Sequence, residues 1–203
     1  MADKAKSKLP IVVTPECRLS FPSLFKKRKY DEDADGDGKF EVTMLFNKKT
    51  NLTQLRKVIE AEAVKKFGTT KGVKLPVLDG DNKGGEIGET YAGHFYAHAK
   101  SIYPVAVVDR DRNELTEEDV YAGCYVKASV AVKADEYKEN GKVKSRYVKL
   151  LLRAVMKTRD GEPFSKVGNA AEDFENEGAD DESNYEADES SEDALDLSEF
   201  GIS

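Results

Sequence analysis

The charge of this chain reverses sign near residue 170, which separates a part that can fold from a part that cannot. Of its 39 acidic and 32 basic residues, 14 acids and no bases lie in residues 170–203, so 25 acids face 32 bases in residues 1–169. The two parts thus carry formal charges of −14 and +7. A segment with many like charges and few apolar residues cannot bury a core. The sequence predicts a folded basic domain at 1–169 and a disordered acidic tail at 170–203.

The acidic tail ends in a short apolar group. Leu195, Leu197 and Phe200 stand among Asp196 and Glu199. A flexible acidic peptide with apolar anchors can dock on a basic surface, either of a partner protein or of the basic domain itself. We therefore predict that Leu195, Leu197 and Phe200 bind partner proteins. A role in solubility alone is the alternative for this tail.

Alternation of apolar and polar residues predicts several strands in the basic domain. It is clearest in Phe40–Phe46, which reads as half-buried, and in His94–Ser101, Cys124–Lys133 and Lys144–Lys157. The Asn140-Gly141 pair predicts a hairpin between the last two strands. In the last strand, the positions expected to face the core are Val148, Leu150, Leu152, Ala154 and Met156.

One helix is expected between the strands. Leu52, Leu55, Ile59 and Ala63 recur at helical spacing until Gly68, where the helix should end. Residues 69–93 are rich in Gly, Lys and Asp and predict a long loop. Several strands around one helix favour a mainly β fold, and we expect an OB-fold-like five-stranded barrel with one principal helix.

The motifs of common enzymes and metal sites are absent or incomplete. Asp31, Asp33 and Asp35 begin a calcium-loop pattern, but Val42 stands where a bidentate glutamate is required. The two cysteines lack metal-site spacing, and the chain has no Walker-type loop. No apolar run approaches the ~20 residues of a membrane span. We expect a soluble cytoplasmic protein that is not an enzyme, binds no metal or cofactor and contacts no membrane.

Basic and aromatic residues share the outward positions of the predicted strands. Aromatic rings that stack on bases, together with cations that neutralise phosphates, allow proteins to hold single-stranded nucleic acid without reading its sequence. The candidate nucleic-acid-binding residues are Phe25, Lys26, Lys27, Arg28, Tyr30, Tyr96, Lys100, Tyr103, Tyr125, Lys127, Tyr147, Lys149 and Arg153.

Four stretches carry a resemblance to a known family. They are the residues RLSFPSLF at 18–25, FYAHAKS at 95–101, VYAGCYV at 120–126 and RDGEPF at 159–164. In these stretches the chain resembles the single-stranded DNA-binding proteins of tailed bacteriophages, which have an OB fold. The resemblance covers almost the whole basic domain. It implies a non-enzymatic protein of the host cytoplasm, whose acidic tail recruits replication or recombination proteins.

We therefore predict sequence-independent binding and protection of single-stranded DNA in phage replication, recombination or repair. The tail is expected to compete with DNA for the basic domain. An RNA-binding or nucleic-acid chaperone module is one alternative, because a 2′-hydroxyl contact leaves no trace in composition. An acidic DNA mimic, in which the tail is the active part, is another. The sequence is also compatible with a homo-oligomer.

Overall fold

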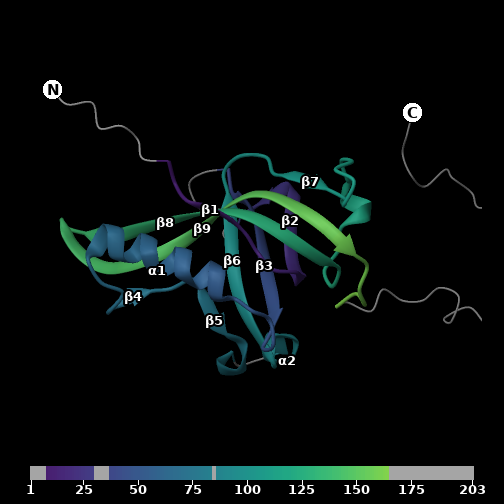
Figure 1. The fold of residues 1–203 in the computed structure, drawn as a ribbon. Coiled ribbons are helices and arrows are strands. Elements are labelled where there is room, and N and C mark those ends of the chain that lie inside the picture. Colours follow the sequence, from purple (N-terminus) through teal and green to yellow (C-terminus); the bar gives the residue numbers. More distant parts are fainter. Residues whose placement is uncertain (1–7, 30–36, 84–85, 165–203) are drawn as a thin grey trace, which may run out of the picture. The chain divides into compact units, whose positions relative to one another are not determined.

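A computed structural model describes residues 8–29, 37–83 and 86–164 of the chain, and these residues are mainly β structure with one main helix (Figure 1). The strands are β1 (Ile11–Val13), β2 (Cys17–Arg28), β3 (Lys39–Asn47), β4 (Val73–Lys74), β5 (Val77–Asp79), β6 (His94–Ser101), β7 (Ala106–Val108), β8 (Tyr125–Glu139) and β9 (Lys142–Arg159). The helices are α1 (Thr53–Phe67) and α2 (Glu86–Tyr91), with the 3-10 turns η1 (Gly80–Asn82) and η2 (Glu117–Asp119).

All nine of these strands belong to one sheet. Its strand order is β1-β8-β2-β3-β6-β9-β4; β5 pairs with β6, β7 pairs with β9, and β8 also pairs with β9. The predicted mainly β architecture with one principal helix is confirmed. Five strands have eight residues or more, which matches the number expected, but of these only β3, β6, β8 and β9 lie where alternation predicts a strand, and β2 was not predicted. The other four strands have three residues or fewer. Alternation cannot identify strands that short. Residues 69–93, which were expected to form a loop, contain β4, β5, η1 and α2. These elements are too short for alternation or helical spacing to identify them.

Helix α1 forms where the apolar spacing predicts it and lies beside the β8–β9 pair (Figure 1). Its buried residues are Leu55, Ile59 and Ala63. The helix ends at Gly68, which has a φ of 74° and donates its N–H to the Val64 carbonyl at 2.8 Å. This left-handed backbone conformation is readily adopted by glycine, so the predicted end of the helix is confirmed.

The two longest strands form a hairpin around the predicted turn. Asn140 and Gly141 connect β8 to β9 and have φ values of 50° and 75°. Positive φ at both loop positions is what a type I′ hairpin turn requires, and Asn-Gly is its preferred pair. The turn fixes the register, so that Lys133 lies opposite Lys149 and Asp135 opposite Tyr147.

A β-bulge at Arg153 changes which side of β9 faces the core. Ser129 pairs with Ala154 while the next residue of β8, Val130, pairs with Leu152. Arg153 is therefore an extra residue, and the side-chain alternation of β9 shifts by one position beyond it. Val155 is buried, whereas Ala154 and Met156 are only half-buried. The prediction that Ala154 and Met156 face the core is wrong for this reason.

Strand β3 is buried on both faces, so the expectation of a half-buried strand is also wrong. It lies between β2 and β6. On its outward face, the Thr43 hydroxyl lies 2.8 Å from His98 Nδ1, and the Glu41 carboxylate pairs with Lys100 at 3.0 Å. These long side chains of β6 cover the outward face of β3, which the pattern of a single strand cannot reveal.

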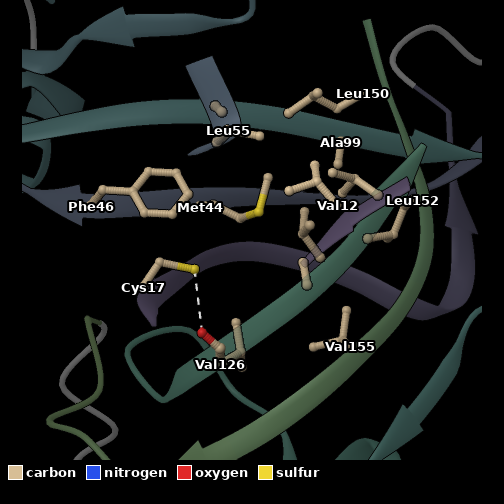
Figure 2. Packing of buried hydrophobic residues seen from close by; sticks show 14 of the residues in the cluster. Val12, Cys17, Met44, Phe46, Leu55, Ala99, Val126, Leu150, Leu152 and Val155 are labelled. Atoms are coloured by element: carbon tan, nitrogen blue, oxygen red, sulfur yellow. Dashed lines mark hydrogen bonds between the residues drawn. The ribbon is translucent and has the colours of Figure 1, made fainter. Parts of the chain in front are cut away.

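The core lies between α1 and the inward face of the sheet. Met44 and Phe46 of β3 are fully buried there, near Leu55 of α1 and Val126 of β8 (Figure 2). The Cys17 thiol donates a hydrogen bond to the Val126 carbonyl at 3.5 Å (Figure 2). Its burial raises the pKa of this thiol far above the usual range. Cys17 and Cys124 are both free and buried, so neither carries a disulfide.

Several predictions concern segments outside the described residues. They include Tyr30, the aspartates at positions 31, 33 and 35, and the tail at 170–203 with Leu195, Leu197 and Phe200. The division into domains at 1–169 and 170–203 therefore stays a prediction. Within the described ranges, no helix is both long and apolar enough to span a membrane.

Candidate nucleic-acid interface

A groove of about 780 Å³ opens on the outward face of the sheet. Its cationic residues are Lys8, Lys39, Lys100, Lys133, Lys149 and Arg153. Its apolar lining includes Leu9, Ile11, Pro76, Leu78, Ile102, Tyr103 and Leu151. None of the described side chains that line it is acidic. The groove therefore combines apolar walls with positive charge.

Strand alternation and register place these cations together. Lys133 and Lys149 are cross-strand neighbours on β8 and β9. Lys100 of β6 lies opposite Leu151 of β9, so it reaches the same face. The residues that alternate with them, such as Val132 and Val148, are buried on the other side of the sheet. The core alternation thus fixes the direction of the cations.

Four predicted site residues line the groove: Lys100, Tyr103, Lys149 and Arg153. The list of predicted residues missed Lys8, Lys39 and Lys133. Lys133 occupies an outward position of a predicted strand, so its alternation could have identified it. Lys8 precedes β1 and Lys39 begins β3. No pattern in the sequence indicates that these two segments meet at one groove.

The apolar side chains of the groove are unusually open to solvent. Tyr103 is 71% exposed and Ile102 is 55% exposed, and Leu78 on β5 is also exposed. The Ser101 hydroxyl bonds to both the N–H and the carbonyl of Tyr103, at 3.0 and 2.8 Å, and so fixes the turn that presents this ring. Exposed flat and apolar side chains beside lysines are suited to stacking on unpaired bases.

Two predicted residues lie farther along the same outward face, on β8. The guanidinium of Arg159 sits 3.2 Å from the centre of the Tyr125 ring, and that of Arg18 sits 5.8 Å from it. Glu16 accepts hydrogen bonds from Arg159 at 3.0 and 3.1 Å, which holds this arrangement. On the face that Arg159 covers, a base could stack on Tyr125 only by displacing this arginine. Lys127 lies opposite Met156 of β9.

Tyr96 and Tyr147 occupy the outward positions predicted for them. Tyr96 packs edge-on against Tyr91, with ring centres 4.9 Å apart, and the ammonium of Lys83 lies 4.9 Å from its ring. Tyr147 is half-buried, and the ammonium of Lys149 lies 5.7 Å from its ring. Each of these rings, like that of Tyr125, therefore has a cation beside it.

The predicted cluster at the end of β2 is divided in the structure. Phe25 is half-buried against the core. Lys26 forms an ion pair with Glu117 at 2.9 Å, and Lys27 lies 3.8 Å from Asp37. Arg28 is the cross-strand neighbour of Lys39, which lines the groove. Of the described residues in this cluster, Arg28 is the one placed beside a groove residue by strand pairing.

A carboxylate next to the lysines of the groove balances part of the positive charge of the groove. Asp135 lies 2.7 Å from the Lys149 ammonium, whose hydrogen bond holds the pKa of Asp135 well below its usual range.

The pKa of His98 is lowered by burial and by the charges of Lys83 and Lys100. Among the described residues, no three His, Cys, Asp or Glu side chains are arranged to hold a metal ion.

Residues 10–184 match the sequence profile of one known protein family. That family is described as "Enterobacter phage Enc34, ssDNA-binding protein". The protein p50 of Acyrthosiphon pisum secondary endosymbiont phage 1 is 31% identical to this chain over 171 residues. The alignment covers 76% of this chain and 86% of p50.

Solved structures show the same fold. The single-stranded DNA-binding protein of bacteriophage Enc34, in complex with ssDNA, matches with a TM-score of 0.63 and 24% identity, over 76% of this chain and 89% of that one. The single-stranded DNA-binding protein gp2.5 of bacteriophage T7 matches with a TM-score of 0.53 and 16% identity, over 84% and 98% of the two chains. The expected OB-like fold is thereby confirmed.

Proposed function

Because the chain belongs to the family of the phage Enc34 ssDNA-binding protein, we propose that it binds single-stranded DNA in the groove on the outward face of its sheet. The binding is independent of sequence and serves phage replication, recombination or repair in the host cytoplasm. No catalytic step is part of this proposal. The observation that carries it is the groove itself, where six cations surround exposed apolar side chains.

The two kinds of lining residue suit the two parts of a single strand. Lys100, Lys133, Lys149 and Arg153 would neutralise phosphates, and the salt dependence of binding would report how many. Tyr103 and the other exposed apolar side chains would contact bases. In a duplex the bases stack on one another, so their faces cannot contact the exposed apolar side chains of the groove. The groove therefore favours single strands over duplex DNA.

The acidic tail at 170–203 would limit this binding and recruit partners. Its charge of −14 opposes the +7 of residues 1–169. A flexible chain of 34 residues reaches ~30 Å by random-coil scaling, so its carboxylates could compete with phosphates for the groove at high local concentration. Leu195, Leu197 and Phe200 would then dock replication or recombination proteins.

A competition titration of the full chain tests the proposal. Labelled oligo-dT is bound first and then displaced with single-stranded DNA, duplex DNA or single-stranded RNA. We expect single-stranded DNA to compete best. Equal competition by RNA would favour the alternative of an RNA-binding or chaperone module.

The site is tested by charge reversal in the same assay. Lys149→Glu should weaken binding to oligo-dT, whereas Lys71→Glu, an exposed lysine that does not line the groove, should have a smaller effect. Both variants change the net charge equally. Equal losses in the two variants would contradict the assignment of the groove. If the tail were the active part, as in a DNA mimic, its removal would abolish activity.

A further inference from the structure

Three lysines converge on one carboxylate at the groove. Asp135 of β8 lies 2.7 Å from the Lys149 ammonium, 3.4 Å from that of Lys133 and 3.5 Å from that of Lys66. The side chain of Asp135 is 26% exposed, so solvent and a ligand can reach it. Three positive charges thus surround one negative charge.

The three lysines come from three elements, α1, β8 and β9. Lys133 and Lys149 are paired across β8 and β9. Lys66 comes from the last turn of α1, and its ammonium also donates to the carbonyl of Ala134 at 3.0 Å. The ammonium groups are therefore held close together before any ligand binds. Their mutual repulsion is offset by Asp135.

Such a cluster has the chemistry of a phosphate site. Lys133 and Lys149 line the groove, whereas Lys66 and Asp135 do not. A carboxylate and a phosphodiester both present negative oxygens that accept hydrogen bonds from ammonium groups. The Asp135 oxygens accept from Lys149 on one side and from the Glu136 N–H, at 3.1 Å, on the other. Asp135 therefore engages the same ammonium groups that a ligand oxygen in the groove would bind.

We propose that Lys133 and Lys149 form a phosphate subsite of the groove, with Lys66 paired to the same carboxylate beside it, and that Asp135 is an internal competitor which a DNA phosphate displaces from these lysines. The inference rests on the proposed function and identifies a residue that limits its affinity. Each bound strand loses part of its attraction to Lys133 and Lys149 because these lysines must first separate from Asp135. The cost keeps binding reversible at this end of the groove.

The test is to remove the charge of Asp135 from the full chain. Asp135→Asn should tighten binding to oligo-dT by about two- to fivefold at low salt, the range expected for an exposed ion pair. The gain should shrink as salt rises, because exposed charges are screened. Asp135→Glu, which keeps the charge, should bind like the wild type.

Glu136→Gln is the matched control. Glu136 is the next residue, its side chain is 25% exposed, and its partner is Lys138 at 2.8 Å, a residue that does not line the groove. The substitution changes the net charge by the same amount. We expect Glu136→Gln to alter oligo-dT affinity much less than Asp135→Asn. Equal gains in the two variants would show a general effect of net charge and overturn the proposal.

Unchanged or weaker binding by Asp135→Asn would also overturn the proposal, because Asp135 would then only position the lysines. Asp135→Ser makes the same charge change with a different side chain and replaces Asp135→Asn if that variant does not fold. Arg153→Glu, in the groove but outside the cluster, separates the two proposals. If Arg153→Glu leaves DNA binding intact, the groove is not the site. If it weakens binding while Asp135→Asn has no effect, only the competitor role fails.

Discussion

The backbones of Gly123 and Gly161 lie so close together that a side chain at either position would collide with a carbonyl oxygen. A Cβ on Gly161 would meet the carbonyl of Gly123, and a Cβ on Gly123 would meet that of Glu162. Arg18 closes this contact, because its guanidinium donates to the Glu162 carbonyl at 2.6 Å and to the Gly123 carbonyl at 3.3 Å. Three of the four stretches that carry the family resemblance therefore meet in space.

This contact predicts an unusual sensitivity to alanine. Gly123→Ala should lower the free energy of unfolding by ~1–3 kcal/mol more than Gly72→Ala, the usual cost of overpacking. Both glycines have positive φ, but a Cβ on Gly72 would meet nothing within 4 Å. The difference between the two variants in urea denaturation measures this contact together with the larger φ of Gly123, which is 114° against 74° at Gly72. Equal losses would show that only the backbone conformation matters.

Tyr103 is predicted to stack on a base. Replacing it with alanine should cost ~1–3 kcal/mol in affinity for oligo-dT, as for other stacking aromatics. The ring is 71% exposed, so the free energy of unfolding should change little. Tyr137→Ala is the control, since Tyr137 is 55% exposed on β8 but does not line the groove. A similar loss of affinity in both variants would remove Tyr103 from the site.

The lowered pKa of His98 predicts a loss of stability in mild acid. Its causes are burial and the nearby charges of Lys83 and Lys100. The unfolded chain takes up this proton more readily than the folded one, so the free energy of unfolding should fall as pH drops below ~6.5, the ordinary pKa of histidine. Asp135, whose pKa is lowered, begins to lose its contribution only below ~pH 4.

Urea denaturation between pH 7 and pH 5 measures this effect. His98→Gln should flatten the pH dependence in this range, because it removes the group that titrates. The same substitution at His94, the other histidine of the chain, is the control. A pH dependence that persists in His98→Gln would assign the effect to another group.

Removal of the acidic tail should strengthen DNA binding. A chain truncated after Asn169 loses 14 acids and no bases. We expect it to bind oligo-dT more tightly than the full chain, with the largest difference at low salt, because attraction between the tail and the basic domain is screened as salt rises. Equal affinities at low salt would leave the tail with partner recruitment or solubility alone. Fluorescence anisotropy titrations at two salt concentrations measure the difference.

The end of helix α1 and the turn between β8 and β9 were predicted correctly, because each depends on residues that are close together in the sequence. The helix ends at Gly68 and the hairpin turns at Asn140-Gly141 because single residues there favour those backbone conformations. The outward direction of Lys100 and Lys149 follows from alternation with buried neighbours on the same strand. A sequence carries this information within a few residues, so these features could be predicted without a structure.

Features that depend on neighbouring strands could not be predicted in the same way. The bulge at Arg153 is set by pairing with β8, and it redirects Ala154 and Met156. The outward face of β3 is covered by side chains of β6, which lie far along the chain. Lys8 and Lys39 join the groove only because the sheet brings their segments together. Each of these features is a property of a pair of segments.

The position of β9 in the sheet has a consequence for biosynthesis. This strand, the last one described, pairs with β4, β6, β7 and β8. A nascent chain that has left the ribosome only as far as Asn140 therefore lacks the strand on which four others depend. The pairings of β9 with β4, β6 and β7 join residues distant in sequence, so they form slowly and late, whereas the β8–β9 hairpin is local. Until β9 emerges, β6, β7 and β8 lack this partner strand and part of their apolar surface stays exposed, so chaperones have their best opportunity to bind the chain.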